Sequence, residues 1–156
     1  MKVYNLLLPE MIIPNVKAAD AYGLLKEIVA HLKDRKKITK DKELLTKLLS
    51  REKLGSTAIG EEVAIPHCKM KGLKKPIVLL AVSRKGVDFS ALDKKPTRIF
   101  FLIISCPDNP SLNLQILAAI AHLVRKAKNL KKKILEAETE NQMLDIIRDE
   151  EEQLHE

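Results

Sequence analysis

The sequence has few of the residues that mark several common classes of protein. It contains no tryptophan, and aromatic residues make up only 3% of the 156. Few side chains are therefore available to stack on bases, and the lysines occur mostly as separate pairs such as Lys36-Lys37. We do not expect the chain to bind nucleic acid, although its formal net charge is +7.

Cysteine is scarce as well. Cys68 and Cys106 lie far apart and form no C-x-x-C motif, so neither a disulfide framework nor a zinc site is predicted and both thiols are expected to be reduced. Cys68 directly follows His67, and neighbours on an extended backbone point to opposite faces, which argues against a hydrolase built from this pair. Whether Cys106 approaches His67 in space, the sequence leaves open.

Long apolar segments are also missing. The longest runs, 77–82 and 99–104, have the length of strands rather than of membrane-spanning helices. Leu6-Leu7-Leu8 is ended by Pro9 and is too short for a signal peptide. We therefore expect a cytoplasmic protein with no membrane insertion. The length and the 46% hydrophobic content fit one domain over residues 1–156.

The charge is unevenly distributed along the chain. Nine acidic residues and a single arginine follow from position 136 onward, which gives this tail a charge of −8 and the first 135 residues a charge of +15. The segment Asp149 to Glu152 would place negative charge at the negative end of a helix dipole, so we expect that end to fray.

Hydrophobic periodicity and capping residues predict alternating strands and helices. Short strands are expected at 11–13 and 63–65, and the apolar runs 76–84 and 98–106 are typical of central strands covered on both faces. Residues 84–89 have the composition of a turn. Together with the helices below, this predicts an α/β fold of three layers, in which a small mixed sheet has helices on both faces.

Four helices are expected from capping residues and apolar spacing. They begin after Asp20, at Asp41, after Asn109-Pro110 and after the capping box that Thr139 opens. The third helix should run to about Lys128 with His122 facing solvent. Its expected buried positions are Leu114, Leu117, Ala118, Ala121 and Val124.

His67 is the candidate functional residue. Pro66 restricts its own φ and biases Ile65 toward extended geometry, so the imidazole follows a backbone with little freedom. Upstream, the segment 55–60 begins and ends with glycine and contains Ser56 and Thr57, and glycine lets a chain pass close to a ligand. Gly60 and the two hydroxyl residues are therefore candidates for an anion-binding loop.

Arg51 lies on the shoulder of the buried stripe of the second helix. Two interpretations stay open: a cation that complements the C-terminal helix dipole, and a guanidinium that faces a phosphate. No G-x-S-x-G motif, Walker loop or dinucleotide fingerprint is present. A nucleophilic imidazole beside donors that suit an anion is typical of a group carrier.

These segments resemble a known family. Arg51-Glu52, the segment 55–60 and above all the segment 63–67 (Val-Ala-Ile-Pro-His) are similar to the fructose- and mannitol-type enzyme IIA domains of the bacterial phosphoenolpyruvate-dependent phosphotransferase system, including the nitrogen-regulatory branch. Segments 86–93 and 114–117 follow in the family's order, so the resemblance covers nearly the whole chain.

The resemblance implies that His67 accepts a phosphoryl group from the carrier HPr and passes it to an enzyme IIB or uses it as a regulatory switch. Arg51 would be the phosphate-binding arginine, and neither a metal nor another cofactor is expected. Where the family usually has glycine and a second active-site histidine, this chain has Glu62 and Asn113. Asn113 can donate a hydrogen bond to a phosphate but cannot carry a proton.

Two other functions remain open at this stage. The chain would be a regulatory module if phosphorylation switches partner contacts, or an interaction scaffold if Asn113 and Glu62 have ended phosphoryl transfer. Glu62 would either repel a phosphate or face solvent.

Overall fold

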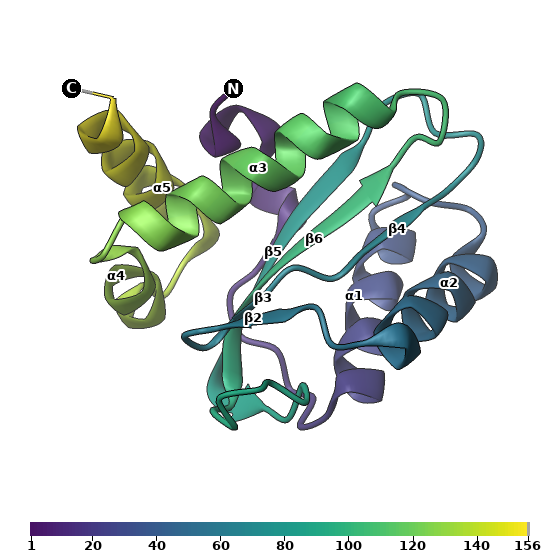
Figure 1. Ribbon diagram of the computed structural model, residues 1–156, viewed down its shortest axis with the longest axis horizontal. Coiled ribbons are helices and arrows are strands. Elements are labelled where there is room, and N and C mark those ends of the chain that lie inside the picture. Colours follow the sequence, from purple (N-terminus) through teal and green to yellow (C-terminus); the bar gives the residue numbers. More distant parts are fainter. Residues whose placement is uncertain (156) are drawn as a thin grey trace.

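The computed structural model describes residues 1–155 and confirms an α/β fold with a mixed sheet between helices (Figure 1). Two 3-10 helices, η1 (Val3–Leu6) and η2 (Pro9–Met11), lead into the sheet. The strands are β1 (Ile12–Ile13), β2 (Ala58–Gly60), β3 (Val63–Ala64), β4 (His67–Lys69), β5 (Ile77–Val87) and β6 (Thr97–Ser105). The helices are α1 (Ala21–Asp34), α2 (Asp41–Leu54), α3 (Pro110–Lys126), α4 (Leu130–Glu136) and α5 (Glu140–Leu154).

The strand order is β1-β5-β6-β3-β2, and β4 continues the β3 side by pairing with β6 as well. β5 and β6 are antiparallel, whereas β1 is parallel to β5, and β3 and β4 are both parallel to β6. The long strands β5 and β6 therefore lie at the centre, and the segment that carries His67 lies beside β6.

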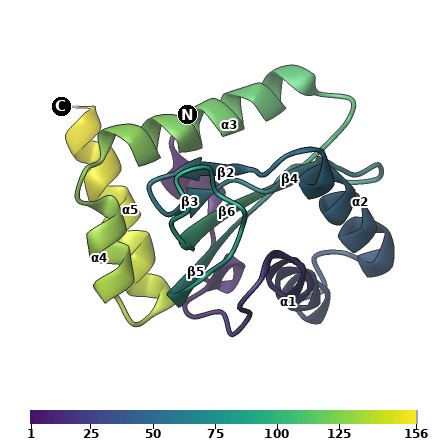
Figure 2. The ribbon, with the colours of Figure 1, turned by 60° about the horizontal axis from the view of Figure 1, so that its bottom comes forward.

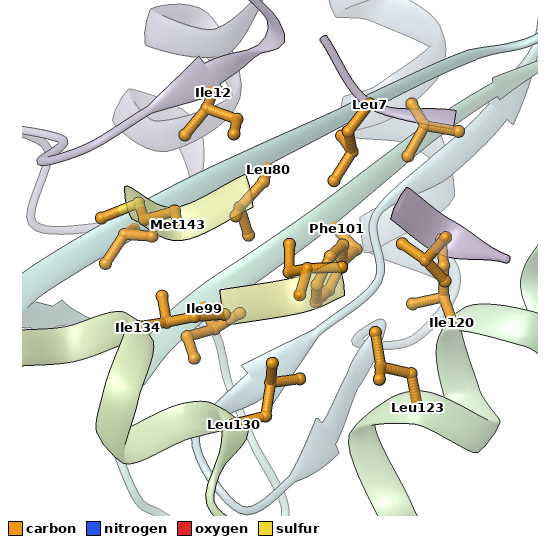
Figure 3. Packing of buried hydrophobic residues seen from close by; sticks show 14 of the residues in the cluster. Leu7, Ile12, Leu80, Ile99, Phe101, Ile120, Leu123, Leu130, Ile134 and Met143 are labelled. Atoms are coloured by element: carbon orange, nitrogen blue, oxygen red, sulfur yellow. The ribbon is translucent and has the colours of Figure 1, made fainter. Parts of the chain in front are cut away.

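Each face of the sheet has its own hydrophobic core. Ile99, Phe101 and Ile103 of β6 belong to the cluster that α3, α4, α5 and η1 cover, whereas Phe100 and Leu102 belong to the cluster under α1 and α2. Figure 2 shows the two layers of helices, and Figure 3 shows the first cluster. The alternation has the period of two that a strand imposes, which confirms that the apolar runs are strands buried on both faces.

The helix caps that the sequence predicts at Asp20, Asn109 and Thr139 are confirmed. Asp20 Oδ1 accepts a hydrogen bond from Gly23 N at 2.8 Å, and Asn109 caps α3 by accepting from Leu112 N. Thr139 and Gln142 form the expected capping box. No helix within residues 1–155 is both long and apolar enough to cross a bilayer.

The expected buried face of α3 is wrong. The fully buried residues of this helix are Ile116, Ile120 and Leu123, whereas Leu114 is 68% exposed. Apolar residues occur on nearly every side of this helix, so its spacing alone does not select one stripe. His122 faces solvent as expected.

The expected turn at 84–89 is also wrong, because β5 continues to Val87. Val87 pairs with Thr97 after an irregularity in the register, and both are fully buried. Gly86 adopts φ +88°, and a Cβ at that position would lie 2.6 Å from Pro96. The pairing with β6 thus outweighs the turn-like composition.

The acidic end of the chain does not fray. α5 extends to Leu154, with Glu150 and Glu151 buried. The Glu151 carboxylate accepts hydrogen bonds from the backbone N–H groups of Val3 at 2.6 Å and Tyr4 at 2.7 Å. The N–H groups at the start of η1 therefore stabilise the negative charge of Glu151, which the dipole of α5 disfavours at this end.

Candidate functional site

His67 begins β4 immediately after a buried backbone. Val63 and Ala64 pair with Ile99 and Phe100 of β6, and the Pro66 carbonyl accepts a hydrogen bond from Ile103 N at 3.0 Å. These bonds hold the segment on both sides of the proline against the central strand. The side chain of His67 is partly buried.

One hydrogen bond determines which ring nitrogen of His67 carries the hydrogen. Nδ1 lies 2.8 Å from the carbonyl oxygen of Ile65, two residues earlier in the chain. Because a carbonyl only accepts, Nδ1 carries the hydrogen in this contact. Nε2 of the neutral ring then keeps its lone pair.

His67 borders a cavity of about 350 Å³ between β4, β6 and the beginning of α3. Asn113 borders the same cavity, so the structure brings these two candidates together. α3 begins here, and its N-terminal dipole end favours an anion. The other lining residues are Cys68, Lys69, Ile103, Ser105, Pro110, Leu114 and Leu117.

Lys69 is a cavity residue that the sequence reasoning missed. It lies two positions after His67 on the same strand, so both side chains project from one face. A period-of-two pattern was available as a signal, but β4 was not predicted as a strand. Lys69 supplies an exposed positive charge beside the imidazole.

The amide of Asn113 is only half satisfied. Its Nδ2 donates to the Cys106 carbonyl at 2.9 Å, while its buried Oδ1 has no hydrogen-bond partner among residues 1–155. An amide nitrogen has two hydrogens. One hydrogen of Nδ2 is therefore not used by the bond to Cys106.

Arg51 does not border this cavity. It lies in the last turn of α2, where Nη1 donates to the Gly55 carbonyl at 2.8 Å. The sequence left two interpretations of Arg51 open. This contact agrees with the first, in which the cation complements the C-terminal end of the helix. α2 nevertheless packs against β4, and the remaining N–H groups of the guanidinium are not used by that bond.

The hydroxyl residues of the upstream loop are bonded within the chain. Ser56 Oγ donates to the Phe89 carbonyl at 2.6 Å, and Thr57 donates to the Glu52 carboxylate through both its backbone N–H and its hydroxyl. Neither residue borders the His67 cavity. Their contacts tie the segment between α2 and β2 to the end of α2 and to the residues that follow β5.

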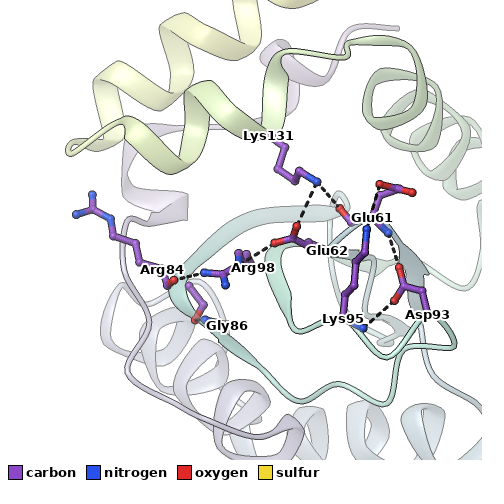
Figure 4. A network of polar contacts seen from close by, with 9 residues as sticks. Glu61, Glu62, Arg84, Gly86, Asp93, Lys95, Arg98 and Lys131 are labelled. Carbon is purple, nitrogen blue, oxygen red and sulfur yellow. Dashed lines mark hydrogen bonds and ion pairs between the residues drawn. The ribbon is translucent and has the colours of Figure 1, made fainter.

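Gly60 lies at the turn between β2 and β3, away from His67. Gly60 pairs with Val63, which in turn pairs with Ile99 of β6. His67 pairs with Ile103, four positions further along the same strand. Glu62 in the same turn forms ion pairs with Arg98 at 2.7 Å and with Lys131 at 3.4 Å (Figure 4). The carboxylate of Glu62 is thus neutralised by two cations and does not border the cavity.

The thiol beside His67 is a poor nucleophile. Burial raises the pKa of Cys68 to about 11, and the nearby Lys47 lowers it by less than burial raises it. The thiolate is the reactive form of cysteine. The pair His67–Cys68 therefore lacks the activated thiol that a cysteine hydrolase needs.

Comparison with known proteins identifies the family. The family model described as "Phosphoenolpyruvate-dependent sugar phosphotransferase system, EIIA 2" matches residues 5–150. The chain belongs to the type 2 enzyme IIA family. The sequence resemblance is thus confirmed, and this enzyme IIA is a member of a phosphocarrier family.

Two relatives represent different branches. The enzyme IIA chain is 31% identical over 147 residues to the fructose-specific EIIABC component of Bacillus subtilis, covering 94% of this chain but only 23% of that protein. It is 35% identical over 134 residues to a nitrogen regulatory protein of Bradyrhizobium diazoefficiens, covering 85% of this chain and 86% of that protein.

Solved structures confirm the fold of this enzyme IIA. The nitrogen regulatory protein IIA-Ntr of Neisseria meningitidis superposes with a TM-score of 0.84 at 24% identity, covering 93% of this chain and 98% of that one. Enzyme IIA-Mtl of Escherichia coli, solved in complex with phosphorylated enzyme IIB-Mtl, gives 0.73 at 19% identity, covering 92% and 97%.

Proposed function

We propose that His67 is the phosphoryl acceptor of this enzyme IIA, charged by an HPr-type phosphocarrier. The observation that carries the proposal is the Nδ1 contact with Ile65, which leaves Nε2 as the free lone pair at a cavity rimmed by Lys69 and Asn113. The proposal includes a cytoplasmic location, because phosphoenolpyruvate, the ultimate donor, is a cytoplasmic metabolite.

The transfer is an in-line displacement. The lone pair of His67 Nε2 attacks phosphorus while the bond from phosphorus to the donor's histidine nitrogen breaks and its electron pair returns to that nitrogen. The positive charge that develops on the His67 ring is stabilised by the Ile65 carbonyl through the Nδ1–H bond. In a second displacement of the same kind, a nucleophile of the next acceptor attacks phosphorus, the bond to His67 Nε2 breaks and its electron pair returns to that nitrogen.

The phosphoryl oxygens need positive partners in the cavity. Lys69, the N-terminal end of α3 and the second amide hydrogen of Asn113 supply them in our proposal. Arg51 joins them through the N–H groups that its bond to Gly55 leaves unused, since a guanidinium has five N–H donors. Ser56, Thr57 and Gly60 act by positioning: their contacts hold the chain between α2 and β3.

The acceptor is proposed from the relatives. Enzyme IIA-Mtl was solved with phosphorylated enzyme IIB-Mtl, which supports an enzyme IIB as the partner of this chain. A relative that is matched over 86% of its own length is a nitrogen regulatory protein, which supports the second candidate, in which phosphorylation switches binding to a regulatory target.

Phosphorylation in vitro tests the proposal. The protein is incubated with labelled phosphoenolpyruvate, enzyme I and HPr, and its acid-labile label is counted for wild type, His67→Ala and the matched control His122→Ala. His122 is exposed on α3 and does not border the cavity. We expect label on wild type and on the control but none on His67→Ala.

The proposal fails if His67→Ala is labelled as fast as wild type, or if folded wild type takes up no label, which would favour the scaffold function. A chase separates the two candidates that remain. Loss of label to an added enzyme IIB supports a role in sugar transport, and retention of label with a change in bound proteins supports the regulatory switch.

A further inference from the structure

We propose that a second cavity, at the C-terminal end of α3, binds a small organic anion with an apolar body. This cavity of about 230 Å³ lies between the end of α3, α4 and the strands β3 and β6. It shares no lining residue with the cavity of His67. Its lining residues are Glu61, Val63, Ile99, Phe101, Val124, Arg125, Ala127, Lys128, Leu130 and Lys131.

The inner wall of this cavity is apolar. Val63, Ile99, Phe101 and Leu130 are at most 3% exposed and belong to one hydrophobic cluster. A drug-sized ligand usually occupies about 300 Å³ or more, and an apolar cavity of about 150 Å³ accommodates benzene. The volume of this cavity, about 230 Å³, lies between these two values and suits one ring or one branched chain with a small polar group attached.

The rim of the cavity is basic. Arg125 and Lys128 have no acidic partner within ion-pair distance among residues 1–155, and Arg125 Nε bonds only to the Ala121 carbonyl of its own helix. Lys131 is held by the Glu62 carboxylate and by the Glu61 carbonyl (Figure 4). Two uncompensated cations therefore remain where a ligand would enter.

The one carboxylate on the rim does not cancel this charge. The side chain of Glu61 is 79% exposed and its carboxylate lies 4.0 Å from the ammonium group of Lys95, which is not a lining residue of the cavity (Figure 4). An apolar floor below two free cations is complementary to a carboxylate that carries a hydrophobic group. Acetate would pair only with the cations of the rim, and a neutral alcohol of the same shape would contact only the apolar wall.

The test uses phenylacetate as the probe, with acetate and 2-phenylethanol as the two half-matched compounds. Each is titrated into the ¹⁵N-labelled full chain while amide chemical shifts are followed. We expect saturable shifts of the amides of residues 124–131 with phenylacetate, and an affinity for either half-matched compound that is lower by about fivefold or more. The readout needs no phosphorylation, so it is independent of the proposed function.

Matched double variants locate the binding charge. Arg125→Gln with Lys128→Gln removes both free rim cations, whereas Lys126→Gln with Lys132→Gln removes the same charge from exposed positions outside the cavity. We expect the first pair to weaken phenylacetate binding by about fivefold or more and the second to change it by less than about twofold. No saturable shift, shifts centred on His67, equal binding of 2-phenylethanol, or equal effects of the two pairs would overturn the proposal.

Discussion

The carbonyl of Ile65 and the ring of His67 belong to one short segment, with Pro66 between them. The proline restricts its own φ and biases Ile65 toward extended geometry, which limits how the carbonyl and the ring can lie relative to one another. The tautomer of His67 is thus set by local sequence rather than by a distant partner. The free lone pair on Nε2, which the proposed phosphoryl transfer needs, follows from three consecutive residues.

At the same scale, Arg51 has two separable roles that substitution can distinguish. Arg51→Ala removes one hydrogen bond at the exposed Gly55 carbonyl, so we expect the thermal midpoint to fall by only about 2–4 °C. If the guanidinium also binds the phosphoryl group in the transition state, the rate of labelling by HPr should fall by about tenfold to a hundredfold.

The matched control for Arg51 is Lys53→Ala, an exposed cation in the same last turn of α2. Its labelling rate should equal that of wild type. If Arg51→Ala is also labelled at the wild-type rate, the arginine only closes the helix and has no part in phosphoryl transfer.

The elements that could be predicted are those whose signals are local. The caps at Asp20 and Thr139 act within three residues, so their helices follow from sequence alone. The buried stripe of α3 and the extension of β5 depend on what packs against them, and Val87 is held by Thr97 across the sheet. The occurrence of His67 and Asn113 in one cavity likewise needs the placement of α3 against β6, the strand with which β4 pairs.

The end of α5 is the clearest case of a long-range override. Helix electrostatics predicts fraying there. The carboxylate of Glu151 nevertheless accepts hydrogen bonds from the N–H groups of Val3 and Tyr4, which precede it by 148 and 147 positions in the sequence. We expect Glu151→Ala to destabilise the protein by about 2–3 kcal/mol, because the buried N–H of Val3 loses its acceptor. Glu151→Gln keeps one acceptor oxygen and should fall between Ala and wild type.

Urea unfolding measures this effect through the midpoint at constant slope. Glu152→Ala is the control, since Glu152 is exposed in the same turn and should change stability by less than about 0.5 kcal/mol. Equal losses for the two variants would mean that general charge repulsion, and not the contact with η1, determines the stability of this end.

For the whole molecule, the two hydrophobic clusters share their central strands. Leu80 and Phe101 face one layer of helices and Leu79 and Phe100 the other, and all four are fully buried. Neither layer can separate from the sheet without exposing one full face of β5 and β6. Loss of that burial, at roughly 1.5–3 kcal/mol for each large side chain, would exceed the stability of an ordinary domain.

We therefore predict that the chain unfolds as one cooperative unit. Amide signals of α1, which covers one face, and of α5, which covers the other, should lose intensity at the same urea concentration when followed residue by residue in ¹⁵N spectra. The midpoint for β5 and β6 should coincide with both. Loss of α3, α4 and α5 at a lower urea concentration, with α1 and the sheet still native, would show that the shared strands do not couple the two layers and that residues 1–156 are not a single folding unit.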